Sequence, residues 1–203
     1  MPALSILASY NKSIDDINIL ENYILSSLAL DARYQHIIGE VIMLRLFSIV
    51  ESTISEFALK LACGANYKNG NSPIVLLRSR SMQNAYSNML SYNRRRALRY
   101  LRWTKASFVK ESIEHVLDIS DTFYTKVNIY GNLINEMRIV RNHIAHRSTS
   151  TRSEYITLLR LKYGGNPNLT VGAYLTSTAR NSTPNIRTYI ASTRIVLHEI
   201  SEG

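Results

Sequence analysis

The sequence predicts an all-α protein, a helical bundle followed by a C-terminal extension. The chain has only 8 glycines and 4 prolines in 203 residues, which favours long regular elements over a turn-rich β architecture. Hydrophobic residues make up 45% of it, enough for a buried core. Apolar residues also recur at three- and four-residue steps, the spacing of amphipathic helices. We expect residues 1–150 to form the helical core, and residues 151–203 an extension with a loop region and a final helix packed on that core.

Two long amphipathic helices are predicted in the N-terminal part of the chain. The first covers residues 14–32, with Ser13 as its N-cap. The second covers residues 35–63 and is expected to stop at Gly64, because glycine readily adopts the left-handed conformation that ends helices. After a polar loop, a shorter helix is expected over residues 73–91.

Positive charge is concentrated in the middle of the chain. The net charge is +9, and residues 57–110 contain eleven lysines and arginines and no acidic residue. Within this stretch, residues 92–103 are predicted to form a helix that interleaves arginines with tyrosines and a tryptophan. Guanidinium groups bind phosphate and aromatic rings stack on bases, so this composition predicts an RNA-binding surface. A solvated helix face whose aromatic side chains belong to the core is the alternative. The RNA-binding candidates are Arg94, Arg95, Arg96, Arg99, Arg102 and Lys105, with Arg138 and Arg147 further along the chain.

The C-terminal part mixes helical patterns with shorter, less certain elements. Residues 110–147 are predicted to be helical with a break near residues 118–121. Residues 153–163 fit either a helix or a strand, and residues 169–175 alternate weakly, so a short strand or hairpin is expected in the extension. Residues 164–168 fit a loop, and Thr183-Pro184 is expected to cap the final helix.

Other features of the sequence limit the class of protein. The single cysteine, Cys63, excludes an internal disulfide framework and a multi-cysteine metal site. The N-terminus lacks the features of a signal peptide, and no apolar run approaches the ~20 residues that a membrane span needs. We therefore expect a soluble, cytoplasmic protein without a membrane partner. A basic helical protein that lies on anionic membranes is disfavoured, because polar residues surround the basic segment.

The stretch Met137–Arg147, here the motif segment, carries the densest group of candidate functional residues. It reads M-R-I-V-R-N-H-I-A-H-R, with three arginines, an asparagine and two histidines in eleven positions. Histidine transfers protons near neutral pH, and arginine presents a fixed fork of donors to phosphate. Arg141 falls on the apolar stripe of the predicted helix, where a cation needs a partner or an interface.

Residues 141–146 have the form R-N-x-x-A-H, which resembles the signature of HEPN domains. This all-α superfamily contains many metal-independent RNA endonucleases, among them CRISPR-associated RNases and the toxins of toxin–antitoxin pairs. The resemblance implies that Arg141 and His146 are catalytic and that Asn142 is the polar residue that follows the arginine. It also implies RNA as substrate, no cofactor, a homodimer with a composite active site, and a role in phage defence or beside an antitoxin or regulatory protein. Glu51 matches a glutamate of some HEPN subfamilies, and His143 is an auxiliary candidate.

The expected chemistry is cleavage of single-stranded RNA by the adjacent 2′-hydroxyl. Such cleavage needs a base near that hydroxyl, an acid near the leaving 5′-oxygen and a cation for the phosphorane charge. On a regular helix, five positions place Arg141 and His146 ~140° apart. Either the helix therefore ends near Ala145, or a second copy of the chain completes the site. His143 and His146 alone form no zinc site, since no further ligand lies at helical spacing. A non-catalytic HEPN-like module that binds RNA, a nucleotide or a protein is the alternative function.

Overall fold

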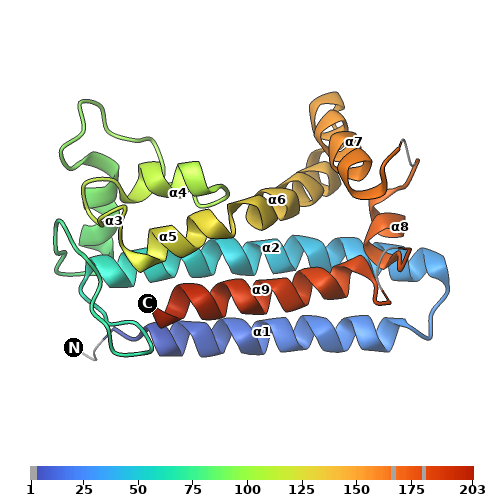
Figure 1. Ribbon diagram of the computed structural model, residues 1–203, viewed down its shortest axis with the longest axis horizontal. Coiled ribbons are helices and arrows are strands. Elements are labelled where there is room, and N and C mark those ends of the chain that lie inside the picture. The colour runs from blue at the N-terminus through green and yellow to red at the C-terminus, as the bar shows by residue number, and fades with distance from the viewer. Residues whose placement is uncertain (1–3, 166–167, 180–181) are drawn as a thin grey trace. The chain divides into compact units, whose positions relative to one another are not determined.

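The computed structural model describes residues 4–165, 168–179 and 182–203, and within them the protein is all-α, as predicted (Figure 1). The helices are α1 Ile6–Ser27, α2 Ala32–Ala62, α3 Met82–Ser91, α4 Ala106–Ile113, α5 Thr122–Ile129, α6 Gly131–His146, α7 Thr149–Tyr163, α8 Val171–Thr176 and α9 Asn185–Glu202. Extended pairing among the described residues is limited to one isolated β-bridge, between Val75 and Leu117. None of the described helices is both long and apolar enough to cross a membrane.

The chain divides into two compact units, each built from separate stretches of sequence. The first unit contains Met1–Ile14, Val50–Ile134 and Arg194–Gly203, and the second contains Asp15–Ile49 and Asn135–Thr193. The long helices α1, α2, α6 and α9 each contribute residues to both units, so no cut at one point of the sequence can separate them.

The first unit has an apolar core supplemented by buried hydrogen bonds. Phe57 and Phe123 are fully buried in it. Ser13, predicted as an N-cap, instead lies inside α1, where its buried hydroxyl is 2.7 Å from the Thr53 hydroxyl. The prediction failed because serine is also tolerated inside a helix when its hydroxyl bonds the preceding turn, as Ser13 does to the Ser9 carbonyl at 2.9 Å.

The short helix expected over residues 73–91 begins only at Met82. Ser81 is its N-cap and accepts a hydrogen bond from the Asn84 backbone N–H at 3.1 Å. The preceding residues are extended, because the Leu76 N–H donates to the Val116 carbonyl at 3.0 Å. Asp121 holds the same stretch in place, because its carboxylate accepts a hydrogen bond from the Ile74 N–H at 2.7 Å. The same carboxylate also caps α5. The break predicted near residues 118–121 is thus confirmed.

The basic segment at residues 92–103 is not a helix, contrary to the prediction. Figure 1 shows the chain between α3 and α4 as a long loop. Two causes can be named. Arginines at positions 95 and 99 would repel each other one helical turn apart. The loop also satisfies its backbone in other ways, because the Leu98 N–H donates to the Leu90 carbonyl at 2.8 Å and the Arg102 N–H donates to the Ser112 hydroxyl at 2.9 Å.

In the second unit, the strand or hairpin expected at residues 169–175 is instead the helix α8. Val171, Gly172, Tyr174 and Leu175 are buried, which is helical spacing, and so short an apolar run cannot be assigned by pattern alone. Residues 153–163 are helical, within α7. Of the loop expected at residues 164–168, residues 166 and 167 lie outside the described residues. The final helix follows Pro184, as predicted.

A tyrosine cluster holds α6, α8 and α9 together within the second unit. The Tyr174 and Tyr189 hydroxyls are 2.7 Å apart, and the Tyr189 hydroxyl also donates to the Glu136 carboxylate. Lys162 of α7 forms an ion pair with Glu136 at 2.9 Å. Burial raises the pKa of both tyrosines, so their hydroxyls keep their protons for these bonds. This network anchors α6 at Glu136, directly before the motif segment.

Candidate functional site

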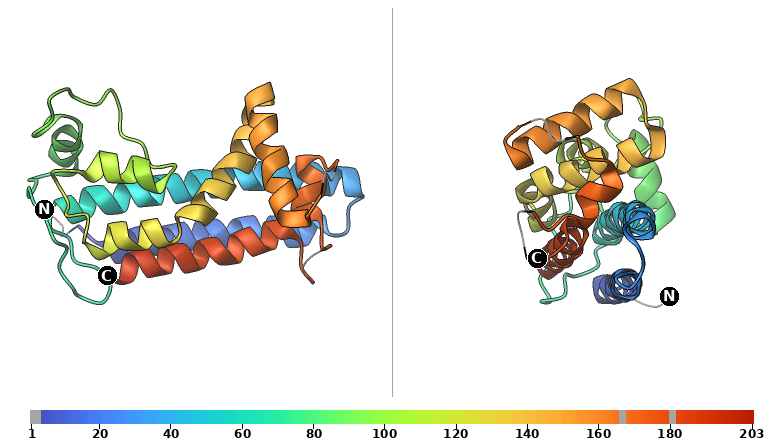
Figure 2. Two further views of the ribbon diagram at one scale, coloured as in Figure 1. Left: turned by 45° about the horizontal axis from the view of Figure 1, so that its top comes forward. Right: turned by 90° about the vertical axis from the view of Figure 1, so that its right-hand side faces the viewer.

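The motif segment ends in a sharp turn between α6 and α7, which Figures 1 and 2 show. Arg147 has a φ of 44°, a left-handed conformation that ends α6, and its N–H donates to the His143 carbonyl at 3.1 Å. Ser148 then caps α7 by accepting from the Thr151 N–H at 3.3 Å. Few residues other than glycine, asparagine and aspartate adopt a positive φ. The hydrogen bond that ends α6 and the N-cap that begins α7 together hold the backbone of Arg147 in this conformation.

The three predicted catalytic residues lie on the last turns of α6. Arg141 is half-buried, and its guanidinium donates to the Asn142 side-chain oxygen at 3.1 Å. No carboxylate of the described residues lies within ion-pair distance of Arg141. His146 is exposed, and its side chain makes no hydrogen bond or ion pair within the described part of the chain. The cation and the imidazole therefore both remain available to a ligand.

The helix α6 is regular from Arg141 to His146 and ends there, one residue beyond Ala145. On the continuous helix the side chains of Arg141 and His146 leave the axis ~140° apart. The helix alone therefore does not bring the two side chains to one point.

His143 lies beside a cavity of about 460 Å³, here the His143 cavity. Its imidazole stacks on the Tyr155 ring with centroids 5.0 Å apart, and its Nδ1 is 3.3 Å from the Thr151 hydroxyl. The partial burial of the ring and the positive charges of Arg147 and Arg152 lower the pKa of His143. The imidazole is therefore held in a fixed orientation and in its neutral form at neutral pH.

Charged side chains from three elements line this cavity. Arg147 reaches the Glu40 carboxylate of α2 at 3.4 Å, and the other oxygen of Glu40 accepts from the Gly172 N–H of α8 at 3.1 Å. Arg152 projects from the first turn of α7. Glu40 and Arg152 were missed by sequence reasoning, because they belong to different helices and only the fold brings them to His143. The one available signal was that Arg152 follows the motif segment closely in the chain.

The other predicted residue of the motif segment, Arg138, is engaged within the protein. Its guanidinium donates to the Asn135 side chain at 3.1 Å and pairs with Glu154 at 3.2 Å, and its side chain is only 12% exposed. We therefore assign Arg138 to the packing of α6 against α7. Glu51 is half-buried on α2 and belongs to the first unit.

The basic loop between α3 and α4, in the first unit, contains two kinds of arginine. Arg94 and Arg102 hold the loop: Arg94 bonds the Met89 carbonyl at 3.0 Å, and Arg102 pairs with Glu111 and lies over the Phe108 ring at 3.8 Å. Arg95, Arg96 and Arg99 are exposed, and their side chains have no ion pair or hydrogen bond with the described residues. Tyr92 and Tyr100 are exposed on the same loop, and Lys105 is half-buried at the start of α4. The free cations and exposed rings occur together here.

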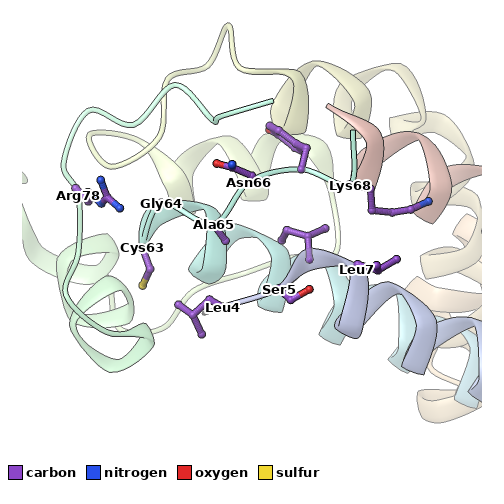
Figure 3. Close-up of a pocket in the computed structure, with 11 residues that line it drawn as sticks. Leu4, Ser5, Leu7, Cys63, Gly64, Ala65, Asn66, Lys68 and Arg78 are labelled. Atoms are coloured by element: carbon purple, nitrogen blue, oxygen red, sulfur yellow. The ribbon is translucent and has the colours of Figure 1, made fainter. Parts of the chain in front are cut away.

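A different hollow, of about 580 Å³, lies in the first unit beside Cys63 (Figure 3). Gly64 faces Arg78 so closely that a Cβ at Gly64 would be 2.7 Å from the guanidinium. Burial raises the pKa of the Cys63 thiol, which lowers its nucleophilicity at neutral pH. This hollow contains none of the predicted site residues.

No family model matches the sequence, and neither a curated protein nor a solved structure does. Among the residues that the structure describes, no group of three His, Cys, Asp or Glu side chains is placed to hold a metal ion.

Proposed function

We propose that this protein is an endoribonuclease of the HEPN type that cleaves single-stranded RNA without a metal ion. The observation that carries the proposal is the end of α6, where a half-buried arginine lies five positions before an exposed histidine and has no carboxylate partner among the described residues. The all-α fold is consistent with the resemblance of residues 141–146 to the HEPN signature. Phage defence or a toxin–antitoxin pair, with an antitoxin or regulatory partner, is the setting that this resemblance suggests.

In the proposed reaction, the 2′-hydroxyl loses its proton to a base and attacks the adjacent phosphorus. The bond to the 5′-oxygen breaks, and that oxygen takes a proton, leaving a 2′,3′-cyclic phosphate and a 5′-hydroxyl. His146 transfers a proton, and Arg141 donates hydrogen bonds to the negatively charged phosphorane. Asn142 orients the guanidinium through the 3.1 Å hydrogen bond.

We further propose that the active site is composite, formed by two copies of the chain. The support is geometric, because α6 continues through His146 and keeps it ~140° from Arg141 on the helix. A second copy would bring its own His146 to the first copy's Arg141. The half-burial of Arg141 agrees with a position at such an interface.

The proposal is tested by incubating single-stranded RNA with the protein in excess EDTA. We expect wild type to cleave and His146→Ala to lose at least ~100-fold in rate, the usual contribution of general acid–base catalysis. The matched control is His198→Ala, which removes another exposed histidine, on α9. Equal cleavage by wild type and His146→Ala would overturn the assignment of His146.

A second candidate function is RNA binding without cleavage, and the basic loop favours it. Arg95, Arg96 and Arg99 are exposed and unpaired within the described residues, beside exposed tyrosines. Under this alternative, replacing the three arginines with glutamine should strongly weaken RNA binding and reduce the salt dependence of the binding that remains, whereas His146→Ala should have no effect on any RNA-dependent function. A binding titration at two salt concentrations separates the two functions.

A further inference from the structure

The His143 cavity has an excess of positive charge that its single carboxylate does not neutralise. Arg147 and Arg152 each contribute one positive charge and Glu40 one negative charge, which leaves +1 while His143 is neutral. Both oxygens of Glu40 already accept hydrogen bonds, one from Gly172 and one from Arg147. Arg152 is exposed, and its guanidinium has no acceptor among the described residues. Its donors are therefore available to an anion.

The surroundings of His143 leave its second ring nitrogen available to the same anion. The Thr151 hydroxyl donates to the Ser148 carbonyl at 3.1 Å, so the Thr151 oxygen is left to accept from Nδ1–H of His143 at 3.3 Å. In a neutral imidazole that carries its proton on Nδ1, Nε2 is an acceptor. Such a nitrogen can share a proton with a phosphate monoester, whose second ionisation lies near pH ~6.

The size of the cavity limits which phosphate-bearing ligands can fit into it. About 460 Å³ falls in the range of small-molecule sites and would accommodate one nucleotide. Thr170 adds a hydroxyl, and Ile144 and Val171 supply an apolar wall, as such sites have.

We propose that the His143 cavity binds a phosphate monoester carried by a single nucleotide, with Arg147 and Arg152 as the phosphate ligands and His143 sharing a proton with it. Neither Arg141 nor His146 lines this cavity, so the proposal does not depend on RNA cleavage by those residues.

The experiment is a calorimetric titration of the full-length protein with adenosine monophosphate, adenosine and inorganic phosphate at low ionic strength. We expect the monophosphate to bind and adenosine not to bind. Binding of inorganic phosphate would support the same phosphate site, and the ratio of the two affinities would give the contribution of the nucleoside. Arg152→Gln should weaken binding of the monophosphate about tenfold or more, the effect of losing a charge-assisted hydrogen bond.

Two control variants show whether binding of the monophosphate depends on this cavity in particular. Arg160→Gln makes the same charge change on the same helix but at a residue that does not line the cavity, and should keep the affinity within about twofold of wild type. His146→Ala should bind the monophosphate like wild type, which separates this proposal from the proposed nuclease activity. Adenosine binding as tightly as its monophosphate, no binding of the monophosphate, or wild-type affinity in Arg152→Gln would each overturn the proposal.

Discussion

At the scale of single residues, the two histidines of the motif segment have opposite surroundings three positions apart. His146 is exposed and unpaired among the described residues, which suits a group that must reach RNA. His143 is stacked on Tyr155 and hydrogen-bonded through Thr151, which suits a group that must stay in one orientation. The sequence suggested a catalytic role for His146 and an auxiliary one for His143, but it could not reveal the stacking of His143, because Tyr155 comes from the next helix.

The lowered pKa of His143 predicts a specific pH dependence of stability. Its folded-state pKa lies below the value of about 6.5 in the unfolded chain, so protonation favours unfolding. The stability that neutral His143 contributes to the fold is fully present above pH ~6.5 and is lost as pH falls through the folded-state pKa. His143→Gln should therefore lose less stability than wild type between pH 7.5 and pH 5, as measured by urea unfolding at each pH.

The matched control for that measurement is His146→Gln, which leaves the environment of His143 intact. Arg147, Arg152 and Glu40 are the charged groups near His143, and none of them changes in either variant. An identical pH dependence in wild type and His143→Gln would show that His143 has no lowered pKa.

At the scale of elements, the long helices were predictable and the short ones were not. Helix α2 has an extended apolar stripe and a glycine stop, and it was found almost residue for residue. Helix α8 was missed because six residues give too little periodicity and its burial comes from tertiary packing. The loop at residues 92–103 was mistaken for a helix because its apolar residues resemble a helical stripe, whereas Leu101 and Trp103 are buried there without helical backbone.

Because α8 packs closely on α2, adding one methyl group at Gly172 should strongly destabilise the fold. A Cβ at Gly172 would lie 2.4 Å from the His36 Cβ and 2.9 Å from its Cα, too close to a backbone to be relieved by a rotamer change. We expect Gly172→Ala to lower the free energy of unfolding by about 1–3 kcal/mol. Gly165→Ala is the matched control, because nothing lies within 4 Å of a Cβ there. Equal urea midpoints for the two variants would contradict this packing.

At the scale of the whole molecule, the proposed composite site requires two copies of the chain. The prediction concerns mixed dimers of Arg141→Ala and His146→Ala, co-expressed with different tags and purified through both. A mixed dimer would have two composite sites, of which one keeps both Arg141 and His146 and the other has lost both. Its cleavage rate should therefore be about half that of wild type. Each variant alone should be inactive. Mixed dimers as inactive as the single variants would exclude the composite arrangement.

The all-α fold class, the central helices and the motif segment were accessible from sequence, because periodicity and residue type are local properties. The His143 cavity was not accessible, because Glu40, His143 and Arg152 come from three helices. The distinction between anchoring and free arginines also required the structure, since Arg94 and Arg95 are neighbours in sequence but differ in their partners.

The most direct test of the central claim is the chemical identity of the RNA ends produced in excess EDTA. Wild type should produce 2′,3′-cyclic phosphate and 5′-hydroxyl ends, and Arg141→Ala and His146→Ala should produce no such ends. Intact RNA with wild type, or ends bearing a 3′-hydroxyl and a 5′-phosphate, would contradict it.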